Sequence, residues 1–200
     1  MTKDKIFNWR FCLCCGFFFW FVVNLLQGIF TEIQEDEAYY HLWGEHLDWG
    51  YFDHPPMVAL MTFLSSKLFS GTLGVRFFTI IASCLTLFVI WKIASFNCLP
   101  KCDNSRLPQC DSPTIFDATL LFFTLAFSIV MFNIYGFVAT PDASLILFSA
   151  LFLLVYQHYL QDHTWKNALL MGLTMALMVY SKYHAFLLLG LIVLYNLRLL

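Results

Sequence analysis

The chain has 200 residues, of which 60% are hydrophobic and 12% are charged, and its formal net charge is −2. Because soluble domains contain about 25% charged residues, this composition excludes an ordinary soluble protein and indicates an integral membrane protein. No basic patch alternates with aromatic residues as in a groove for nucleic acid, so the composition also argues against nucleic-acid binding.

Six apolar segments approach the roughly 20 residues that a membrane-spanning helix needs. They are predicted at residues 11–30, 71–94, 115–139, 143–160, 167–180 and 184–200, and the fifth is short. Basic residues before the first segment fit a signal peptide, but the apolar run is too long and no small-residue cleavage site follows it. The sequence therefore predicts an all-α bundle of about six spans with an uncleaved first helix.

Lys and Arg predict the orientation of this bundle, because they are enriched in cytoplasmic loops. With a cytoplasmic N-terminus, eight basic residues lie inside and three lie outside, namely Lys67, Arg76 and Lys182. The long loop between the first two spans, residues 31–70, then faces the outside, which is the periplasm in a bacterium.

The second part of this outer loop, residues 57–69, has apolar residues at helical spacing. They form a stripe that consists of Met57, Leu60, Met61, Leu64 and Leu68. This pattern is typical of a helix lying flat at the membrane interface, and a plain extension of the second span is the alternative.

The first part of the outer loop is also predicted to be helical. At 100° per residue, one polar face contains Glu37, His41, Glu45 and Asp48. Asp36 instead falls with Tyr40, Trp43 and Leu47, on the face expected to pack against the protein. A carboxylate on a packing face is costly unless it is paired or functional, so Asp36 indicates a site.

Several motifs follow one another in this chain on the outer side. They are Asp36-Glu37, Gly50-Tyr51-Phe52-Asp53-His54-Pro55-Pro56, Gly74-Val75-Arg76, Thr140-Pro141-Asp142-Ala143 and Ser181-Lys182-Tyr183. With the short N-terminal tail and the first span, this order resembles membrane glycosyltransferases of the GT-C fold. That family includes the protein O-mannosyltransferases, the aminoarabinose lipid A transferases and the bacterial RgtA/B/C/D-like enzymes.

The resemblance begins at about residue 8 and covers only the N-terminal part of such enzymes, which usually have more spans. It implies one membrane glycosyltransferase domain over residues 1–200, truncated at its C-terminus, with the catalytic outer loop at 31–70. The implied reaction moves a hexose or pentose from a polyprenyl-phosphate donor to lipid A, a polysaccharide or a protein. The implied place is the outer face of the bacterial inner membrane, in lipopolysaccharide or other envelope polysaccharide assembly.

Elementary chemistry agrees with this implication. A lipid-linked donor is reached from the bilayer, so no Gly-rich loop that cradles a nucleotide phosphate is needed, and the chain has none. Two alternatives remain: an inactive fragment of such an enzyme, and a transporter. Transporters place ionisable groups near the membrane midplane, whereas the charges here lie at the outer ends of the spans.

The resemblance implies catalytic roles for Asp36, Glu37 and Asp142. Asp36 is the candidate general base for the acceptor hydroxyl, with its pKa tuned by burial near aromatic rings, and a helix N-cap is its structural alternative. Glu37 either helps to bind the acceptor or a divalent cation, or is simply solvated. Asp142 is either a second active-site carboxylate or the N-cap of the fourth span.

Arg76, Lys182 and His54 are the candidates for binding the donor phosphate, because the leaving group needs positive charge or hydrogen-bond donors. Arg76 suits bidentate binding, and both Arg76 and Lys182 have the alternative of an interfacial anchor. His54 occupies a position where family members often have a basic residue before Pro-Pro.

Tyr39, Tyr40 and Trp43 are the candidates for binding the sugar or the acceptor, with the aromatic belt of membrane proteins as the alternative. No tight metal site is predicted, since Glu37 and His41 offer only two ligands at i, i+4 and the seven cysteines follow no zinc pattern. A loosely held divalent cation remains open.

Overall fold

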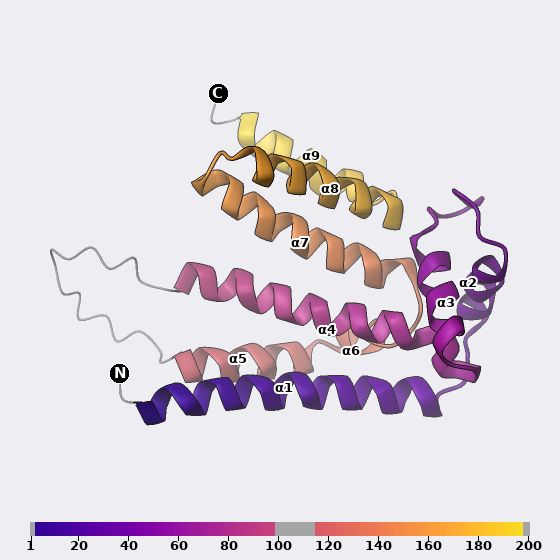
Figure 1. Ribbon diagram of the computed structural model, residues 1–200, viewed down its shortest axis with the longest axis horizontal. Coiled ribbons are helices and arrows are strands. Elements are labelled where there is room, and N and C mark those ends of the chain that lie inside the picture. The colour runs from indigo at the N-terminus through magenta and orange to yellow at the C-terminus, as the bar shows by residue number, and fades with distance from the viewer. Residues whose placement is uncertain (1–2, 99–114, 198–200) are drawn as a thin grey trace, which may run out of the picture.

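In the computed structural model, which describes residues 3–98 and 115–197, every regular element is a helix and no strand occurs (Figure 1). The helices are α1 (Lys3–Phe30), α2 (Glu35–Glu45), α3 (Met57–Leu68), α4 (Gly71–Cys98), α5 (Ile115–Ser128), α6 (Val130–Ile134), α7 (Pro141–Gln161), α8 (Trp165–Ser181) and α9 (Ala185–Leu197). The predicted all-α membrane bundle is thereby confirmed. The long helices run roughly alongside one another, and α2 and α3 cover one end of the bundle.

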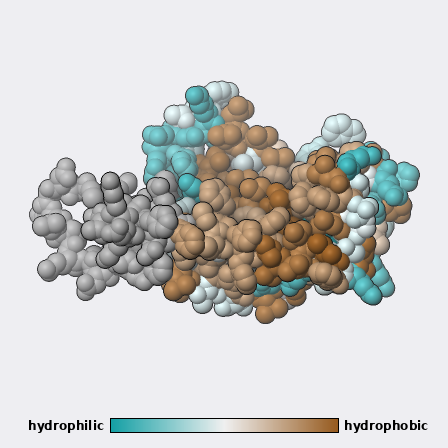
Figure 2. Space-filling view, turned by 60° about the horizontal axis from the view of Figure 1, so that its bottom comes forward, coloured by the Kyte–Doolittle hydropathy of each residue, from teal (hydrophilic) through white to brown (hydrophobic). Residues whose placement is uncertain are grey.

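Three of the described helices are long and apolar enough to cross a membrane. They contain the segments Phe11–Phe30, Gly71–Ser95 and Pro141–Gln161. The other three predicted spans correspond to the shorter helices α5, α8 and α9, so the count of six spans remains a prediction. Figure 2 shows the expected surface pattern, with hydrophobic residues over the middle of one face and hydrophilic residues toward the ends.

The predicted third span, residues 115–139, is interrupted in the structure. Its helix α5 ends at Ser128, and the short α6 follows after Ile129. At the break the Asn133 amide donates hydrogen bonds to the carbonyl oxygens of Phe127 and Ile129, both at 3.0 Å. A side chain that binds backbone carbonyls competes with the helical pattern, which explains why hydropathy alone missed this break.

Helix α4 forms the centre of the bundle, because it packs against α1, α3 and α7. On its α1 side, the fully buried Trp20 donates a hydrogen bond from Nε1 to Ser83 Oγ at 2.9 Å. Trp20 packs there with Leu87 of α4 and Ala126 of α5. The bond satisfies the indole N–H in an apolar surrounding, where an unpaired donor would be costly.

The cap, defined here as residues 31–70, is held together by the contact of α2 with α3. Tyr40 and Trp43 of α2 pack on Val58 and Ala59 of α3. Gly44 permits this close approach, because a Cβ at that position would lie 2.6 Å from Thr62 Oγ1. The short side chains on both helices therefore set the distance between them.

Helix α3 is separate from α4, so the alternative of a plain extension of the second span is wrong. Its buried side is formed by Val58, Ala59, Thr62 and Ser65. Three members of the predicted apolar stripe lie exposed on the other side, namely Leu60, Leu64 and Leu68. An exposed apolar face on a helix at the end of a membrane bundle is what an interfacial helix presents to lipid.

Candidate functional site

The first turn of α2 is organised by Glu37, and the N-cap position is occupied by Gln34. The carboxylate Oε2 of Glu37 accepts a hydrogen bond from the backbone N–H of Gln34 at 3.1 Å. This reciprocal contact is one half of a capping box and satisfies a donor that the helix leaves open. Asp36 therefore is not the N-cap of this helix, and that alternative is wrong.

Glu37 also forms a buried ion pair with Arg76 of α4, and both residues have 0% exposure. Arg76 Nε donates to Oε1 of Glu37 at 2.7 Å, and Nη2 donates to Oε2. The remaining guanidinium donors reach the carbonyl oxygens of Gly28, Thr31 and Glu32 and the hydroxyl of Thr31. The pair thus joins the end of α1, the start of α2 and the start of α4.

The loop before α7 is tied to the same carboxylate. The backbone N–H of Ala139 donates to Oε1 of Glu37 at 2.8 Å, although the two residues are 102 positions apart. Burial pushes the pKa of Glu37 up, but the hydrogen bonds from Arg76, Ala139 and Gln34 outweigh it and hold the pKa below its ordinary value. The tie brings Asp142, in the first turn of α7, to the cap.

These contacts exchange the predicted environments of Asp36 and Glu37, whereas Tyr40 and Trp43 are buried as predicted. Glu37, expected on a solvated face, is fully buried, while Asp36, expected on the packing face, is exposed. The physical reason is that a buried carboxylate needs a cationic partner, and the guanidinium of Arg76 lies next to Glu37. The burial of Asp36 near aromatic rings, which was expected to tune its pKa, is not found.

The position of Arg76 at the start of a span predicted an accessible phosphate ligand. The structure does not show one. The guanidinium of Arg76 is buried, and each of its nitrogens donates to a protein oxygen. An interfacial anchor reaching for lipid headgroups does not fit this burial either. Through these hydrogen bonds, Arg76 holds the cap on the bundle.

Three carboxylates from different segments lie near Tyr40. Its pKa is raised by burial first and then by the negative charges of Asp36, Asp142 and Asp53. We call Asp36, Asp53 and Asp142 the carboxylate cluster. Asp53 was not among the predicted site residues, although its position in the motif at residues 50–56 was the signal that could have identified it.

Asp142 is paired with Lys182, which follows the last residue of α8. The Lys182 Nζ donates to both carboxylate oxygens at 2.8 and 2.9 Å. The two side chains keep 21% and 30% exposure, so the pair is open to solvent and to a ligand. The alternative that Asp142 is the N-cap of α7 is wrong, because Thr140 occupies the N-cap position and Asp142 lies inside the first turn. Its carboxylate is instead engaged by a cation 40 residues away.

His54 lies beside Tyr40 and Trp43, with ring centroids 5.8 and 6.4 Å apart. Its Nδ1 is buried and has no hydrogen-bond partner among the described residues. A buried polar atom of this kind is normally satisfied by a protein group or a water, so His54 brings one unsatisfied nitrogen to the aromatic residues of the cap.

The three predicted aromatic residues have different surroundings. Trp43 is buried and stacks on Tyr51 with a centroid distance of 4.3 Å and an angle of 4°, which makes it a packing residue of the cap. Tyr39 keeps 43% exposure, and its hydroxyl donates to Asp53 Oδ2 at 3.4 Å. Only Tyr39 offers a largely open ring to a sugar, and Tyr40 is buried beside the carboxylate cluster.

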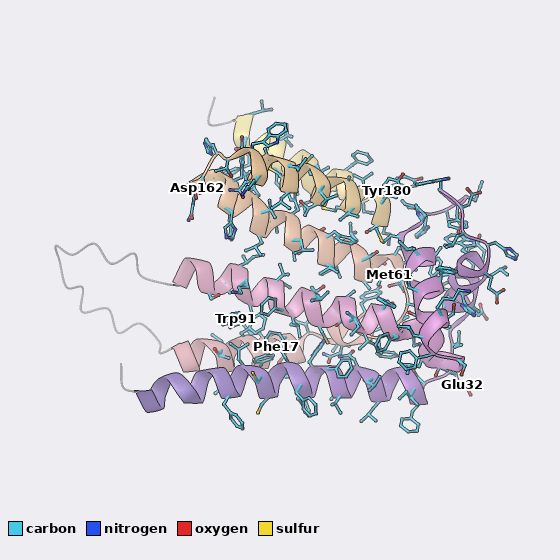
Figure 3. The ribbon with its side chains drawn as sticks, in the orientation of Figure 1. Phe17, Glu32, Met61, Trp91, Asp162 and Tyr180 are labelled. Carbon is cyan, nitrogen blue, oxygen red and sulfur yellow. The ribbon has the colours of Figure 1, made fainter. Side chains whose placement is uncertain are left out.

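An apolar groove of about 400 Å³ adjoins this site. It is lined by Leu47, Asp48, Trp49, Pro56, Met57, Leu60 and Tyr180. Figure 3 shows Tyr180 at the end of α8 that faces the cap. Since Pro56 follows the His54 segment and Tyr180 precedes Lys182, the groove lies between two chain segments that supply candidate site residues.

Within residues 3–98 and 115–197, no group of three or more His, Cys, Asp or Glu side chains is arranged to hold a metal ion. The carboxylate cluster still offers oxygen atoms of the kind that divalent cations prefer. A loosely held cation therefore remains a hypothesis.

Comparison with curated proteins finds the lipid A galacturonosyltransferase RgtD of Rhizobium johnstonii, which is 29% identical to this chain over 169 residues. The match covers 84% of this chain and 32% of that relative, so the chain spans about a third of the relative's length. No family model and no solved structure matches the chain.

Proposed function

We propose that this chain belongs to a membrane glycosyltransferase that takes a sugar from a polyprenyl-phosphate donor. The observation that supports this function best is the convergence of Asp36, Asp53 and Asp142 with Lys182 and His54 at one end of a membrane bundle. Acids suited to proton transfer and donors suited to a phosphate meet there beside an apolar groove. The similarity to a lipid A galacturonosyltransferase points to the same reaction class.

In the proposed reaction, the oxygen of an acceptor hydroxyl attacks the anomeric carbon of the sugar. The bond from that carbon to the phosphate oxygen breaks, and the polyprenyl phosphate leaves with the electron pair. Asp36 accepts the hydroxyl proton, for which its exposure is an advantage, because an acceptor can reach it.

Lys182 and His54 replace Arg76 as the phosphate ligands in this proposal. Lys182 is held by Asp142 in the structure and is still partly exposed, so its ammonium can bind a phosphate while the carboxylate keeps it in place. Tyr39 supplies the open ring for the sugar. The groove beside Tyr180 accepts the start of the donor's apolar chain.

The acceptor is lipid A, a polysaccharide or a protein, in the assembly of the envelope of a bacterium. The excess of basic residues on the N-terminal side supports a cytoplasmic N-terminus and a periplasmic site at the inner membrane. A divalent cation near the carboxylate cluster remains compatible with this reaction.

The test is sugar transfer from a lipid-linked donor by the complete protein in which Asp36 is replaced by Asn. We expect the rate to fall by about 10²–10⁴, the usual contribution of a general base. Glu35→Gln is the matched control, because Glu35 is an exposed acid in the same helical turn, and it should leave transfer unchanged. Near-normal transfer by Asp36→Asn at equal protein level would exclude Asp36 and make Asp142 the candidate base.

A further inference from the structure

A second pocket, of about 410 Å³, lies on the cap where α2, the end of α3 and the start of α4 meet. It is lined by His41, Ser66, Lys67, Leu68, Phe69, Ser70, Gly71 and Gly74. None of these residues belongs to the carboxylate cluster, to its basic partners or to the apolar groove. The volume is in the range of pockets that hold small ligands, which is about 300–1,000 Å³.

Lys67 gives this pocket its charge. Of the three basic residues predicted on the outer side, Arg76 is paired with Glu37 and Lys182 with Asp142. Lys67 has no ion pair within the described part of the chain, and its ammonium lies 4.9 Å from the ring centroid of Phe63. No carboxylate lines the pocket, so the cation is available to an anion from outside the chain.

Two further features of the pocket leave room for a ligand. The Nδ1 of His41 is buried and has no hydrogen-bond partner among the described residues, while its Nε2 lies 4.0 Å from Glu45. Gly71 has a φ of +66°, and a Cβ there would meet nothing within 4 Å, so the backbone borders open space. The first turn of α4, which begins at this glycine, contains no acidic residue.

The position of the pocket identifies the kind of anion. Gly71 is the first residue of the span Gly71–Ser95, so the pocket lies at the membrane end of α4, at the level of lipid headgroups. Leu68 and Phe69 add an apolar side to the same pocket, and both side chains are exposed. A phospholipid combines these two features, with a phosphate for the ammonium and acyl chains for the apolar side.

We propose that this pocket binds the phosphate of an anionic phospholipid through Lys67 and His41. The ammonium of Lys67 forms a charge-assisted hydrogen bond with a phosphate oxygen, and His41 donates a second bond from Nδ1. The site is independent of sugar transfer and would be occupied in the resting protein.

The experiment measures retained lipid by native mass spectrometry of the protein released from nanodiscs. The probes are phosphatidylglycerol, phosphatidylcholine and inorganic phosphate. We expect phosphatidylglycerol to be retained, and we expect Lys67→Gln to weaken its binding about tenfold or more, since hydrogen bonds to charged groups contribute about 1.5–3 kcal/mol. Lys92→Gln is the matched control, an exposed lysine toward the other end of α4 from the pocket, and it should change nothing.

Each remaining outcome decides the proposal. Partial retention by Lys67→Arg and weaker retention by His41→Gln would support the phosphate contact. Equal retention of phosphatidylglycerol and phosphatidylcholine, or unchanged binding by Lys67→Gln, would overturn it. Binding of inorganic phosphate without retention of either lipid would show a free-phosphate site and would also overturn the lipid proposal.

Discussion

The buried pair of Glu37 and Arg76 is the contact whose disruption we expect to cost the most stability. Replacing Glu37 with Gln keeps the size of the side chain but removes its charge and converts one oxygen into an NH2 donor. Each carboxylate oxygen accepts two hydrogen bonds, so either orientation of the amide places its NH2 against two donors. The Arg76 guanidinium then remains buried without a counter-ion.

Breaking one side of a buried ion pair costs about 3–5 kcal/mol. Because 1 kcal/mol changes Tm by roughly 2–4 °C in a chain of this size, Glu37→Gln should lower Tm by roughly 6–20 °C. The assay heats the protein in detergent and measures the monodisperse fraction by size-exclusion chromatography. The control Glu35→Gln, which changes an exposed acid in the same turn, should stay within about 0.5 kcal/mol of the wild type.

Equal Tm values for the wild type, Glu37→Gln and Glu35→Gln would refute the reasoning, because an unpaired buried guanidinium cannot be free of cost. Arg76→Lys separates charge from geometry. Lys keeps the positive charge but cannot reproduce the planar fork of donors, so its Tm should fall between those of the wild type and Glu37→Gln. A wild-type Tm for Arg76→Lys would show that the charge alone stabilises the cap.

Three further outcomes follow from the structure. Because the pKa of Glu37 is lowered, the contribution of its carboxylate to stability is complete above the ordinary value of 4.5 and is lost as the pH falls. The Tm of the wild type should therefore fall more between about pH 5 and 3 than the Tm of Glu37→Gln. Gly44→Val should destabilise the protein by about 1–3 kcal/mol, measured in the same heating assay, because the new side chain collides with Thr62. In a Cys-free background, Asp48→Cys should react with a membrane-impermeant thiol reagent on intact cells, and a retained Cys102 should not; labelling of Cys102 would overturn the proposed orientation.

Hydropathy predicted the helices of the bundle well, because long apolar runs leave few alternatives in a membrane. The fourth predicted span, 143–160, agrees with α7 to within two residues, and the predicted start of the second span, residue 71, is the first residue of α4. The break after α5 was missed, because it depends on where the amide of Asn133 finds carbonyl partners. A hydropathy average contains no information about that choice.

The sequence named candidate site residues but could not predict how they pair. Asp142 and Lys182 were assigned separate roles, and the structure joins them through contacts that no spacing rule gives. Asp36 and Glu37 are consecutive residues of an 11-residue helix, and the apolar pattern alone does not decide which of the two carboxylates is buried. The tertiary contact with Arg76 determines that Glu37 is the buried one. The sequence had suggested two other roles for Arg76, a phosphate ligand and an interfacial anchor.

The hydrogen bond from Ala139 to Glu37 has a consequence for how the protein is made. Arg76 follows Glu37 by 39 residues, so a growing chain can close the ion pair as soon as α4 is inserted. Ala139 is synthesised much later, just before α7, so its hydrogen bond to Glu37 forms only after the ion pair is possible. The event that docks α7 also delivers Asp142 to the carboxylate cluster. The candidate site is therefore completed only after α7 has docked, later than the ion pair that joins α2 to α4.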